Sequence, residues 1–300
     1  EGIISPNTGI YDKGTFKDAG RPYARCWIGS GSGSHGNVNV SEALEVSCNY
    51  FFYTVAYRMN KGAGDLSGIN TLNKYMEAFG LNSPTGVEIS ELYDSMSQYP
   101  THISSPEYKK YITQQRDADA KESDYKWSAG DTIRTAIGQS YNNYTSALMS
   151  KYVATLANGG TRYSMHFLNK ITNNDGKTEE EYQPKVESKI EIKKENLDAI
   201  FKGMFLVTTG PRGTLRNYFK DFPVDVAAKS GTAQQSSKRS EHTTFVAFAP
   251  LEDPQISVCV IIPFGNGTTG PAPKVAKVAI SEYLKLDYKP ELKSYDTLLH

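Results

Sequence analysis

The sequence predicts a mixed α/β domain in which an antiparallel sheet is flanked by helices. In the first two thirds of the chain, apolar residues recur at helical spacing in several stretches. Towards the end, adjacent stretches run apolar or alternate as strands do, with turn-rich segments between them. A chain of 300 residues is long enough to bury one sizeable core, and we expect residues 1–300 to form a single domain.

The first expected helix covers residues 39–59. Asn39 followed by Glu42 fits a capping box, in which each side chain bonds the other residue's backbone N–H. Apolar side chains then recur at helical spacing at Leu44, Phe51, Val55 and Met59.

Two more helices are expected at 145–158 and 195–207, the former ended by the Gly159-Gly160 pair. Between the first two helices, residues 91–130 are polar, aromatic and charged without clean periodicity. We expect these residues to form a long irregular excursion over one face of the domain.

The last part of the chain predicts an antiparallel meander. An apolar stretch, 224–228, leads into the first strand, and the stretches 243–249 and 256–262 form the next two. Residues 275–284 are expected to form a closing helix.

Composition excludes some classes of function. Lys+Arg and Asp+Glu number 33 each, so the net charge at pH 7 is zero and gives no reason to expect nucleic acid as a partner. No apolar run reaches the length of a membrane span, and no secretion signal opens the chain. The strict Gly/Ser alternation at 29–34 has the composition of a flexible linker, and we expect it to replace a loop.

Two short motifs carry chemistry, and their order in the chain is more specific than either alone. Ser-x-Asn occurs once in the first expected helix, and Lys-Ser-Gly-Thr follows an apolar strand. Their residues are Ser47, Cys48 and Asn49, and then Lys229, Ser230, Gly231 and Thr232. This order is typical of β-lactamases and penicillin-binding proteins.

Longer stretches extend the likeness. Three of them resemble the transpeptidase domain of class B penicillin-binding proteins. They are "EALEVSCNYFFYTV" at 42–55, "AIGQSYNNYTSALMSKYVATLANGGTRY" at 136–163, and the 213–234 run into Lys-Ser-Gly-Thr. The elongation-type or sporulation-type members are the most similar. The resemblance implies the penicillin-binding, serine β-lactamase-like fold, with an antiparallel sheet flanked by helices and a helical subdomain.

The resemblance also implies an activity, which is acyl transfer from D-Ala-D-Ala stem peptides of peptidoglycan, with β-lactams as inhibitors. It assigns Ser47 to proton relay and Asn49 to holding the substrate amide. Lys229 would place positive charge near the substrate carboxylate, which the Ser230 and Thr232 hydroxyls would bind. The remaining motif residue, Gly231, would let substrate lie close to the strand.

The nucleophile of this family lies in a Ser-x-x-Lys helical turn, where one turn brings the lysine beside the serine. That turn precedes Ser-x-Asn, and residues 1–6 resemble the stretch just after it. We therefore expect the nucleophilic serine and its lysine to lie outside this chain, which alone would be inactive. The Ser-x-x-Lys at Ser123 lies between the two motifs and is expected to be a decoy.

Three cysteines are an odd number for an extracytoplasmic protein. By resemblance to members with a zinc site, the ligands here would be Asp12, Cys26, His35 and Cys48, with Asp18 as a substitute for Asp12. Two thiolates, an imidazole and a carboxylate would close a tetrahedral structural site. A disulfide between Cys26 and Cys48, or two free thiols, are the alternatives.

The family's setting implies further expectations. The protein would face the cell wall, anchored by an N-terminal membrane helix, and would work beside a membrane glycosyltransferase. A serine β-lactamase or D,D-carboxypeptidase, and a non-catalytic β-lactam sensor or scaffold, are the alternative functions.

Overall fold

The computed structural model describes residues 1–30, 33–62, 65–89, 101–233, 240–265 and 270–288. Its α-helices are α1 (Val40–Glu45), α2 (Asn49–Arg58), α3 (Ser67–Ala78), α4 (Pro106–Arg116), α5 (Glu122–Tyr125), α6 (Ala129–Thr135), α7 (Ser146–Ala157), α8 (Lys194–Thr209), α9 (Arg216–Phe219) and α10 (Ala272–Leu284), with a 3-10 turn η1 (Trp27–Ser30). Its strands are β1 (Ile10–Asp12), β2 (Thr15–Phe16), β3 (Ala24–Arg25), β4 (Gly36–Val38), β5 (Thr161–Tyr163), β6 (Lys170–Thr172), β7 (Thr178–Glu181), β8 (Val186–Lys189), β9 (Ala227–Ala233), β10 (His242–Ala249) and β11 (Ile256–Ile262).

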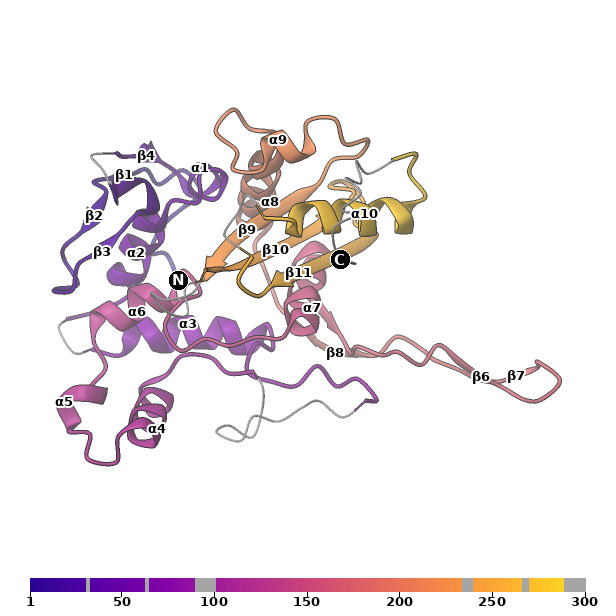
Figure 1. Cartoon of the computed structure of the whole chain (residues 1–300), viewed down its shortest axis with the longest axis horizontal. Helices are drawn as coiled ribbons and strands as arrows, with labels where there is room; N and C mark the ends of the chain where they lie inside the picture. The colour runs from indigo at the N-terminus through magenta and orange to yellow at the C-terminus, as the bar shows by residue number, and fades with distance from the viewer. Residues whose placement is uncertain (31–32, 63–64, 90–100, 234–239, 266–269, 289–300) are drawn as a thin grey trace, which may run out of the picture.

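The three C-terminal strands form the predicted antiparallel meander. They pair in the order β11-β10-β9, with Ser230 of β9 opposite Phe245 of β10. Side chains alternate between the faces of the sheet, so Phe245 packs in the core that contains α10, whereas Phe248 packs in the core that contains α7 and α8. The sheet is thus covered by helices on both faces (Figure 1).

The expected helix 39–59 is wrong in its length, because the chain forms two helices there. The Asn39–Glu42 capping box begins α1 as predicted. However, α1 ends at Glu45, and α2 begins at Asn49 in a new direction. Ser47 lies between them in the left-handed region with φ 54°, which stops helix propagation. Apolar periodicity persisted across this break because both helices bury one face, as Phe51 of α2 shows.

The expected irregular excursion at 91–130 is also wrong over its described part, which holds α4, α5 and the start of α6. The buried residues of α4 are Lys109 and Ile112. The Lys109 Nζ bonds the Asp131 carboxylate at 2.9 Å and the carbonyl of Lys126 at 2.9 Å. A paired lysine therefore occupies a position where helical periodicity requires an apolar residue. The first part of the stretch, 90–100, lies outside the described residues.

The other helix predictions are confirmed by α7, α8 and α10. Two two-stranded antiparallel sheets between α7 and α8 were not expected: β5 pairs with β8, and the β6–β7 hairpin lies between these two strands in the chain. Every residue of β6 and β7 is exposed, so neither strand shows the alternation that marks a half-buried strand. Figure 1 shows β6 and β7 projecting away from the body of the domain. No helix in the described ranges is long and apolar enough to cross a bilayer.

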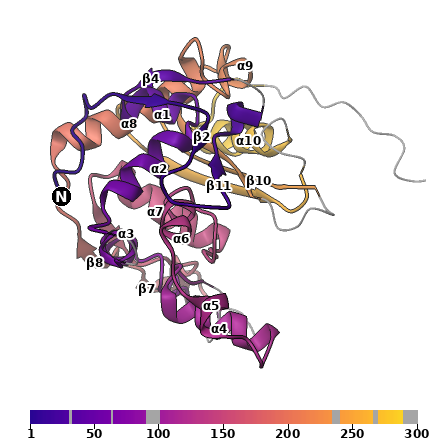
Figure 2. The ribbon, with the colours of Figure 1, turned by 90° about the vertical axis from the view of Figure 1, so that its left-hand side faces the viewer.

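The N-terminal segments from β1 to α2 lie beside the sheet, and α1 joins them to the rest of the domain by packing against α8 (Figure 2). Gly203 of α8 permits this close approach, because a Cβ there would lie 2.6 Å from Leu44 Cδ1 and 3.0 Å from Ser41 Cα. The Ser41 hydroxyl also donates a 2.7 Å hydrogen bond to the carbonyl of Ala199. This packing places α1, which leads into the Ser-x-Asn residues, against α8.

Candidate functional site

The Ser-x-Asn residues form the turn between α1 and α2. The N–H of Cys48 donates to the carbonyl of Ala43 at 2.8 Å, and the N–H of Ser47 donates to that of Leu44 at 3.2 Å. This pair of bonds is a Schellman motif, whose left-handed position usually holds glycine. Here Ser47 occupies it with φ 54°. A side chain at a strained position indicates a function that glycine could not serve.

Ser47 faces the Lys-Ser-Gly-Thr strand. The ammonium of Lys229, on β9, donates to Ser47 Oγ at 2.9 Å and to the carbonyl of Ser230 at 2.6 Å. Burial lowers the pKa of Lys229 from the ordinary 10.5 to about 8. The structure therefore joins the two motifs, 182 residues apart in the chain, in one hydrogen-bonded pair.

The rest of the strand continues from the Lys229–Ser47 pair. Ser230 is 5% exposed, and its Oγ lies 3.4 Å from the Thr214 hydroxyl. Gly231 lies opposite Thr244 of β10, and a Cβ at this glycine would collide with the Thr244 hydroxyl. The neighbouring strand, not only an approaching substrate, therefore requires glycine here. Thr232 lies one residue further along β9, opposite Thr243.

In the described part of the chain β9 pairs with β10 alone, so its other edge is free to pair. A free edge presents backbone N–H and C=O groups to which an extended peptide can add as a strand. Asn49 is the first residue of α2 and lies two residues beyond Ser47.

Ser123 is placed away from the Lys229–Ser47 pair. It lies on α5, is exposed, and donates to the carboxylate of its neighbour Asp124 at 3.3 Å. Both views show α5 far below the sheet (Figures 1 and 2). Its lysine, Lys126, is also exposed and stands in no described contact with Ser47. The geometry agrees with the expectation that this Ser-x-x-Lys is a decoy.

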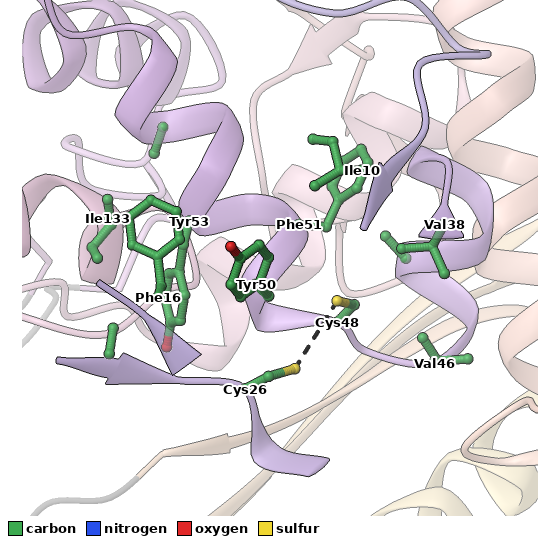
Figure 3. Packing of buried hydrophobic residues seen from close by; sticks show 13 residues of the cluster. Ile10, Phe16, Cys26, Val38, Val46, Cys48, Tyr50, Phe51, Tyr53 and Ile133 are labelled. Carbon is green, nitrogen blue, oxygen red and sulfur yellow. Dashed lines mark hydrogen bonds between the residues drawn. The ribbon is translucent and has the colours of Figure 1, made fainter. Parts of the chain in front are cut away.

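A second cluster lies directly behind the Ser-x-Asn turn. The ligand-type atoms of Asp12, Cys26, His35 and Cys48 all lie within 4.8 Å of one another. Figure 3 shows Cys26 and Cys48 pointing towards each other within the apolar core around α2. Asp12 supplies the carboxylate, whereas its expected substitute Asp18 is exposed.

The separations within the cluster can be compared with those of a metal site. The Cys26 and Cys48 sulfurs are 4.0 Å apart, Cys26 Sγ is 3.4 Å from His35 Nδ1, and Cys48 Sγ is 3.6 Å from Asp12 Oδ2. Zinc bond lengths place tetrahedral ligand atoms roughly 3.3–3.8 Å apart. A disulfide needs about 2.05 Å between sulfurs. Two of these separations, 3.4 and 3.6 Å, fall in the tetrahedral range, whereas the 4.0 Å between the sulfurs lies above it and the 2.7 Å between His35 Nδ1 and Asp12 Oδ2 lies below it. The sulfur separation does not fit a disulfide, and the donor set suits a tetrahedral ion. The cysteines are free, and the short His35–Asp12 contact also fits the free-thiol alternative.

Charges in this cluster are stabilised by neighbouring donors. Burial raises the pKa of Asp12, but N–H bonds from Gly14 at 2.7 Å and His35 at 3.2 Å outweigh burial, and its pKa is lowered overall. The thiol of Cys48 lowers the pKa of Cys26 to about 6, and the proximity of that thiolate raises the pKa of Cys48. One thiolate and one carboxylate thus ionise readily in a buried site, which suits a cation.

Three residues near the site carried no sequence pattern that could have identified them. Thr214 contacts Ser230, Glu45 accepts hydrogen bonds from the loop before Thr214, and Trp27 Nε1 donates to the carbonyl of Val46 at 3.1 Å. Thr214 lay within a stretch that carried the family resemblance, but no spacing rule connects it to Ser230.

Comparisons with known proteins agree with this geometry. Residues 1–280 match the family described as "Penicillin binding protein transpeptidase domain". The peptidoglycan D,D-transpeptidase MrdA of Escherichia coli (strain K12) is 33% identical over 286 residues, covering 90% of this chain and 40% of MrdA. Penicillin-binding protein 2B of Streptococcus pneumoniae (strain TIGR4) is 27% identical over 305 residues, covering 95% of this chain and 41% of that protein. The chain thus spans about two fifths of the length of these curated relatives.

Solved structures share the fold. Penicillin-binding protein 2B of Streptococcus pneumoniae (strain R6) superposes with a TM-score of 0.76 at 23% identity, covering 96% of this chain and 46% of that one. Pseudomonas aeruginosa PBP2 in complex with WCK 5153 superposes with a TM-score of 0.72 at 26% identity, covering 99% and 57%. The predicted penicillin-binding fold is confirmed by these neighbours.

The strained turn at Ser47 predicts an inverted order of stability. In most contexts alanine is more stabilising than glycine, but a Cβ in the left-handed region costs roughly 1–2 kcal/mol. Both Ser47→Gly and Ser47→Ala remove the hydroxyl that accepts from Lys229, and only the glycine relieves the turn. We expect Ser47→Gly to exceed Ser47→Ala in unfolding free energy by about 1 kcal/mol, measured by urea denaturation. An alanine variant at least as stable as the glycine variant would contradict the left-handed turn.

Burial of Lys229 predicts a pH dependence of stability. The folded chain binds this proton less tightly than the unfolded chain, because the pKa of Lys229 is lowered from 10.5 to about 8. Between pH 8 and 10.5 the unfolded chain therefore holds more protons, and the Lys229 contribution to stability rises with pH. We expect the unfolding free energy of the wild type to gain on that of Lys229→Met from pH 8 to 10. Lys202→Met, an exposed lysine on α8, serves as the control and should track the wild type. Parallel curves for wild type and Lys229→Met would refute the lowered pKa.

Proposed function

The chain belongs to the penicillin-binding protein transpeptidase family, and we propose that it forms the substrate-binding side and proton relay of a peptidoglycan D,D-transpeptidase. Such an enzyme transfers an acyl group from a D-Ala-D-Ala stem peptide to an amine on a neighbouring strand. The observation that carries the proposal is the 2.9 Å bond from the Lys229 ammonium to Ser47 Oγ, which joins the two motifs across the cleft.

Each residue then has a role in acyl transfer. A serine oxygen attacks the D-Ala-D-Ala carbonyl, and the departing D-alanine nitrogen must receive a proton. Because Ser47 Oγ accepts from Lys229, the Ser47 O–H is free to point at that nitrogen. A lysine with a pKa of about 8 can replace the proton near neutral pH.

Substrate binding falls to the strand. An extended stem peptide would add to the free edge of β9, with its terminal carboxylate on the hydroxyls of Ser230 and Thr232. Lys229 would supply the positive charge that favours this carboxylate, and Asn49 would hold the substrate amide. β-Lactams would occupy the same positions, because they resemble D-Ala-D-Ala.

The attacking serine is proposed to belong to a Ser-x-x-Lys segment outside these 300 residues. Within them Ser-x-x-Lys occurs at Ser123 on α5, a helix that lies away from β9 (Figure 1). The chain alone would then bind substrate without being acylated. We also propose that the intact protein works on the cell-wall side of the membrane, beside a glycan-polymerising membrane partner. A similar solved structure bears on this, since it concerns polymerization and crosslinking by a peptidoglycan synthase complex.

We further propose that Asp12, Cys26, His35 and Cys48 hold a structural zinc ion. The donor set, whose ligand-type atoms all lie within 4.8 Å of one another, supports a closed four-ligand site, which leaves no open position for catalysis. When bound, zinc would tie the segments that carry these ligands to one another. Since Cys48 adjoins Ser47, the ion would hold the relay serine in its strained turn without touching substrate.

Penicillin acylation tests the proposed function. In the intact protein that carries this domain, fluorescent penicillin should label a serine outside these 300 residues. Lys229→Ala should slow labelling by about 10²-fold or more, as expected for the loss of a proton-transfer group. The control Lys202→Ala should label at the wild-type rate. A label on Ser123, or an unchanged rate in Lys229→Ala, would overturn the assignment.

The lifetime of the labelled protein separates the related functions. An acyl-enzyme that persists for many minutes indicates a transpeptidase, and one that hydrolyses within seconds indicates a β-lactamase. A stem-peptide substrate with an amine acceptor completes the test, because a carboxypeptidase releases D-alanine without forming a cross-linked product. Labelling without either product would indicate a sensor.

Metal analysis tests the zinc proposal. Purified protein should contain about one equivalent of zinc, and Cys26→Ser should lose it together with several degrees of thermal stability. Cys259→Ser, at the cysteine outside the cluster, is the matched control and should retain the ion. Less than about a tenth of an equivalent in the wild-type protein would sink the proposal.

A further inference from the structure

A buried carboxylate without a catalytic assignment lies two residues before the relay serine. Glu45, the last residue of α1, is 3% exposed. A carboxylate that is this deeply buried is retained only where donors compensate for its lost hydration. Its partners therefore indicate what it does.

The partners of Glu45 all belong to the loop that follows α8. Its Oε1 accepts the backbone N–H of Arg212 at 3.0 Å, and its Oε2 lies 3.8 Å from the Arg212 guanidinium. The carbonyl of Glu45 accepts from the N–H of Thr214 at 3.4 Å. Gly210 leaves room for the carboxylate, since a Cβ there would collide with Oε1. Main chain and side chain of one residue thus hold the 210–214 loop against the end of α1.

The same loop also contacts β9, the strand that carries Lys-Ser-Gly-Thr. The Thr214 hydroxyl lies 3.4 Å from Ser230 Oγ, and the Ser230 carbonyl accepts from Lys229 at 2.6 Å. Lys229 in turn bonds Ser47, which follows Glu45 by two residues. The contacts form a closed ring from Glu45 through the loop to β9 and back across the cleft to Ser47.

We propose that Glu45 is a positioning residue that sets the separation between the Ser-x-Asn turn and the Lys-Ser-Gly-Thr strand. It touches neither the substrate nor the reacting atoms. Without the Glu45 contacts, the Lys229–Ser47 bond is the part of the ring that still holds the turn to β9. Loss of the Glu45 contacts therefore lets the turn move away from β9. This inference rests on the proposed function for its importance to catalysis, but not for its geometry.

The first test reads the geometry without any catalysis. Competitive labelling of lysines with acetic anhydride from pH 7 to 11, followed by mass spectrometry, reports the pKa of Lys229 in the chain. In Glu45→Gln the amide oxygen can still accept the Arg212 N–H, but the negative charge is lost and an NH2 group faces the Arg212 guanidinium in place of Oε2. The loop and turn should therefore separate and water should reach Lys229. We expect the pKa of Lys229 to rise by about one unit towards its ordinary value.

Two further variants make this test decisive. Glu42→Gln is the matched control, because Glu42 lies on the same helix and its carboxylate accepts at 2.9 Å from the N–H of Asn39, away from the ring. Thr214→Val opens the ring from its other side, keeps the side-chain volume, and should shift Lys229 as Glu45→Gln does. A pKa of Lys229 unchanged in both Glu45→Gln and Thr214→Val, or shifted equally by Glu42→Gln, would overturn the proposal.

A second test uses penicillin acylation of the intact protein. Glu45→Gln should slow the acylation step about tenfold while noncovalent affinity stays within about twofold. The double variant Glu45→Gln/Lys229→Met should be acylated no more slowly than Lys229→Met alone, because Glu45 acts through the Lys229–Ser47 pair. If the losses in acylation rate of the two single variants multiply in the double variant, the proposed positioning role of Glu45 is contradicted. If the wild type is not acylated, the proposed function fails, whereas the labelling of Lys229 still decides the role of Glu45.

Discussion

The interruption of one helix at Ser47 is the constraint on which the rest of this structure depends. In a continuous helix, Ser47 and Cys48 would lie about 100° apart around a single helix axis, within regular helical turns. The Schellman turn instead exposes consecutive residues to different surroundings. Ser47 faces Lys229 across the cleft, whereas Cys48 faces the cluster with Cys26. The strained backbone of Ser47 therefore serves both the contact with Lys229 and the cluster that contains Cys48.

The turn is held by packing on both sides, as a strained segment must be. On one side, α1 packs against α8 so closely that Gly203 has no space for a side chain. On the other side, the core of the N-terminal part surrounds Cys48 and Phe51 (Figure 3). Polar contacts of Glu45 then hold the end of α1 against the loop that leads to the sheet. Apolar packing fixes the helices, and hydrogen bonds fix the residues that face the cleft.

Burial disfavours the charged form of both ionisable groups nearest this turn, but only one of them has donors that compensate for it. Lys229 has few compensating partners and its pKa falls to about 8, which makes it a proton donor suited to neutral pH. Asp12 is fully buried, but the N–H groups of Gly14 and His35 lower its pKa and keep it ionised. Desolvation thus loosens the proton on Lys229, whereas the N–H donors around Asp12 outweigh desolvation and keep its negative charge.

The sequence by itself determined the class of the fold, the three-stranded meander, the helices α7, α8 and α10 and the two motifs, because these depend on short-range periodicity and on residue order. It also indicated Asp12, Cys26, His35 and Cys48 as one group. It could not locate the end of α1, since the apolar pattern continues through the break, nor the helix α4, whose buried Lys109 hides its periodicity. Only the tertiary structure decided that Ser47 meets Lys229, that Asp12 rather than Asp18 faces the cysteines, and that Glu45 and Thr214 belong to the site. These pairings join residues far apart in the chain, and their geometry follows from how α1, α8 and β9 pack, which no local spacing encodes.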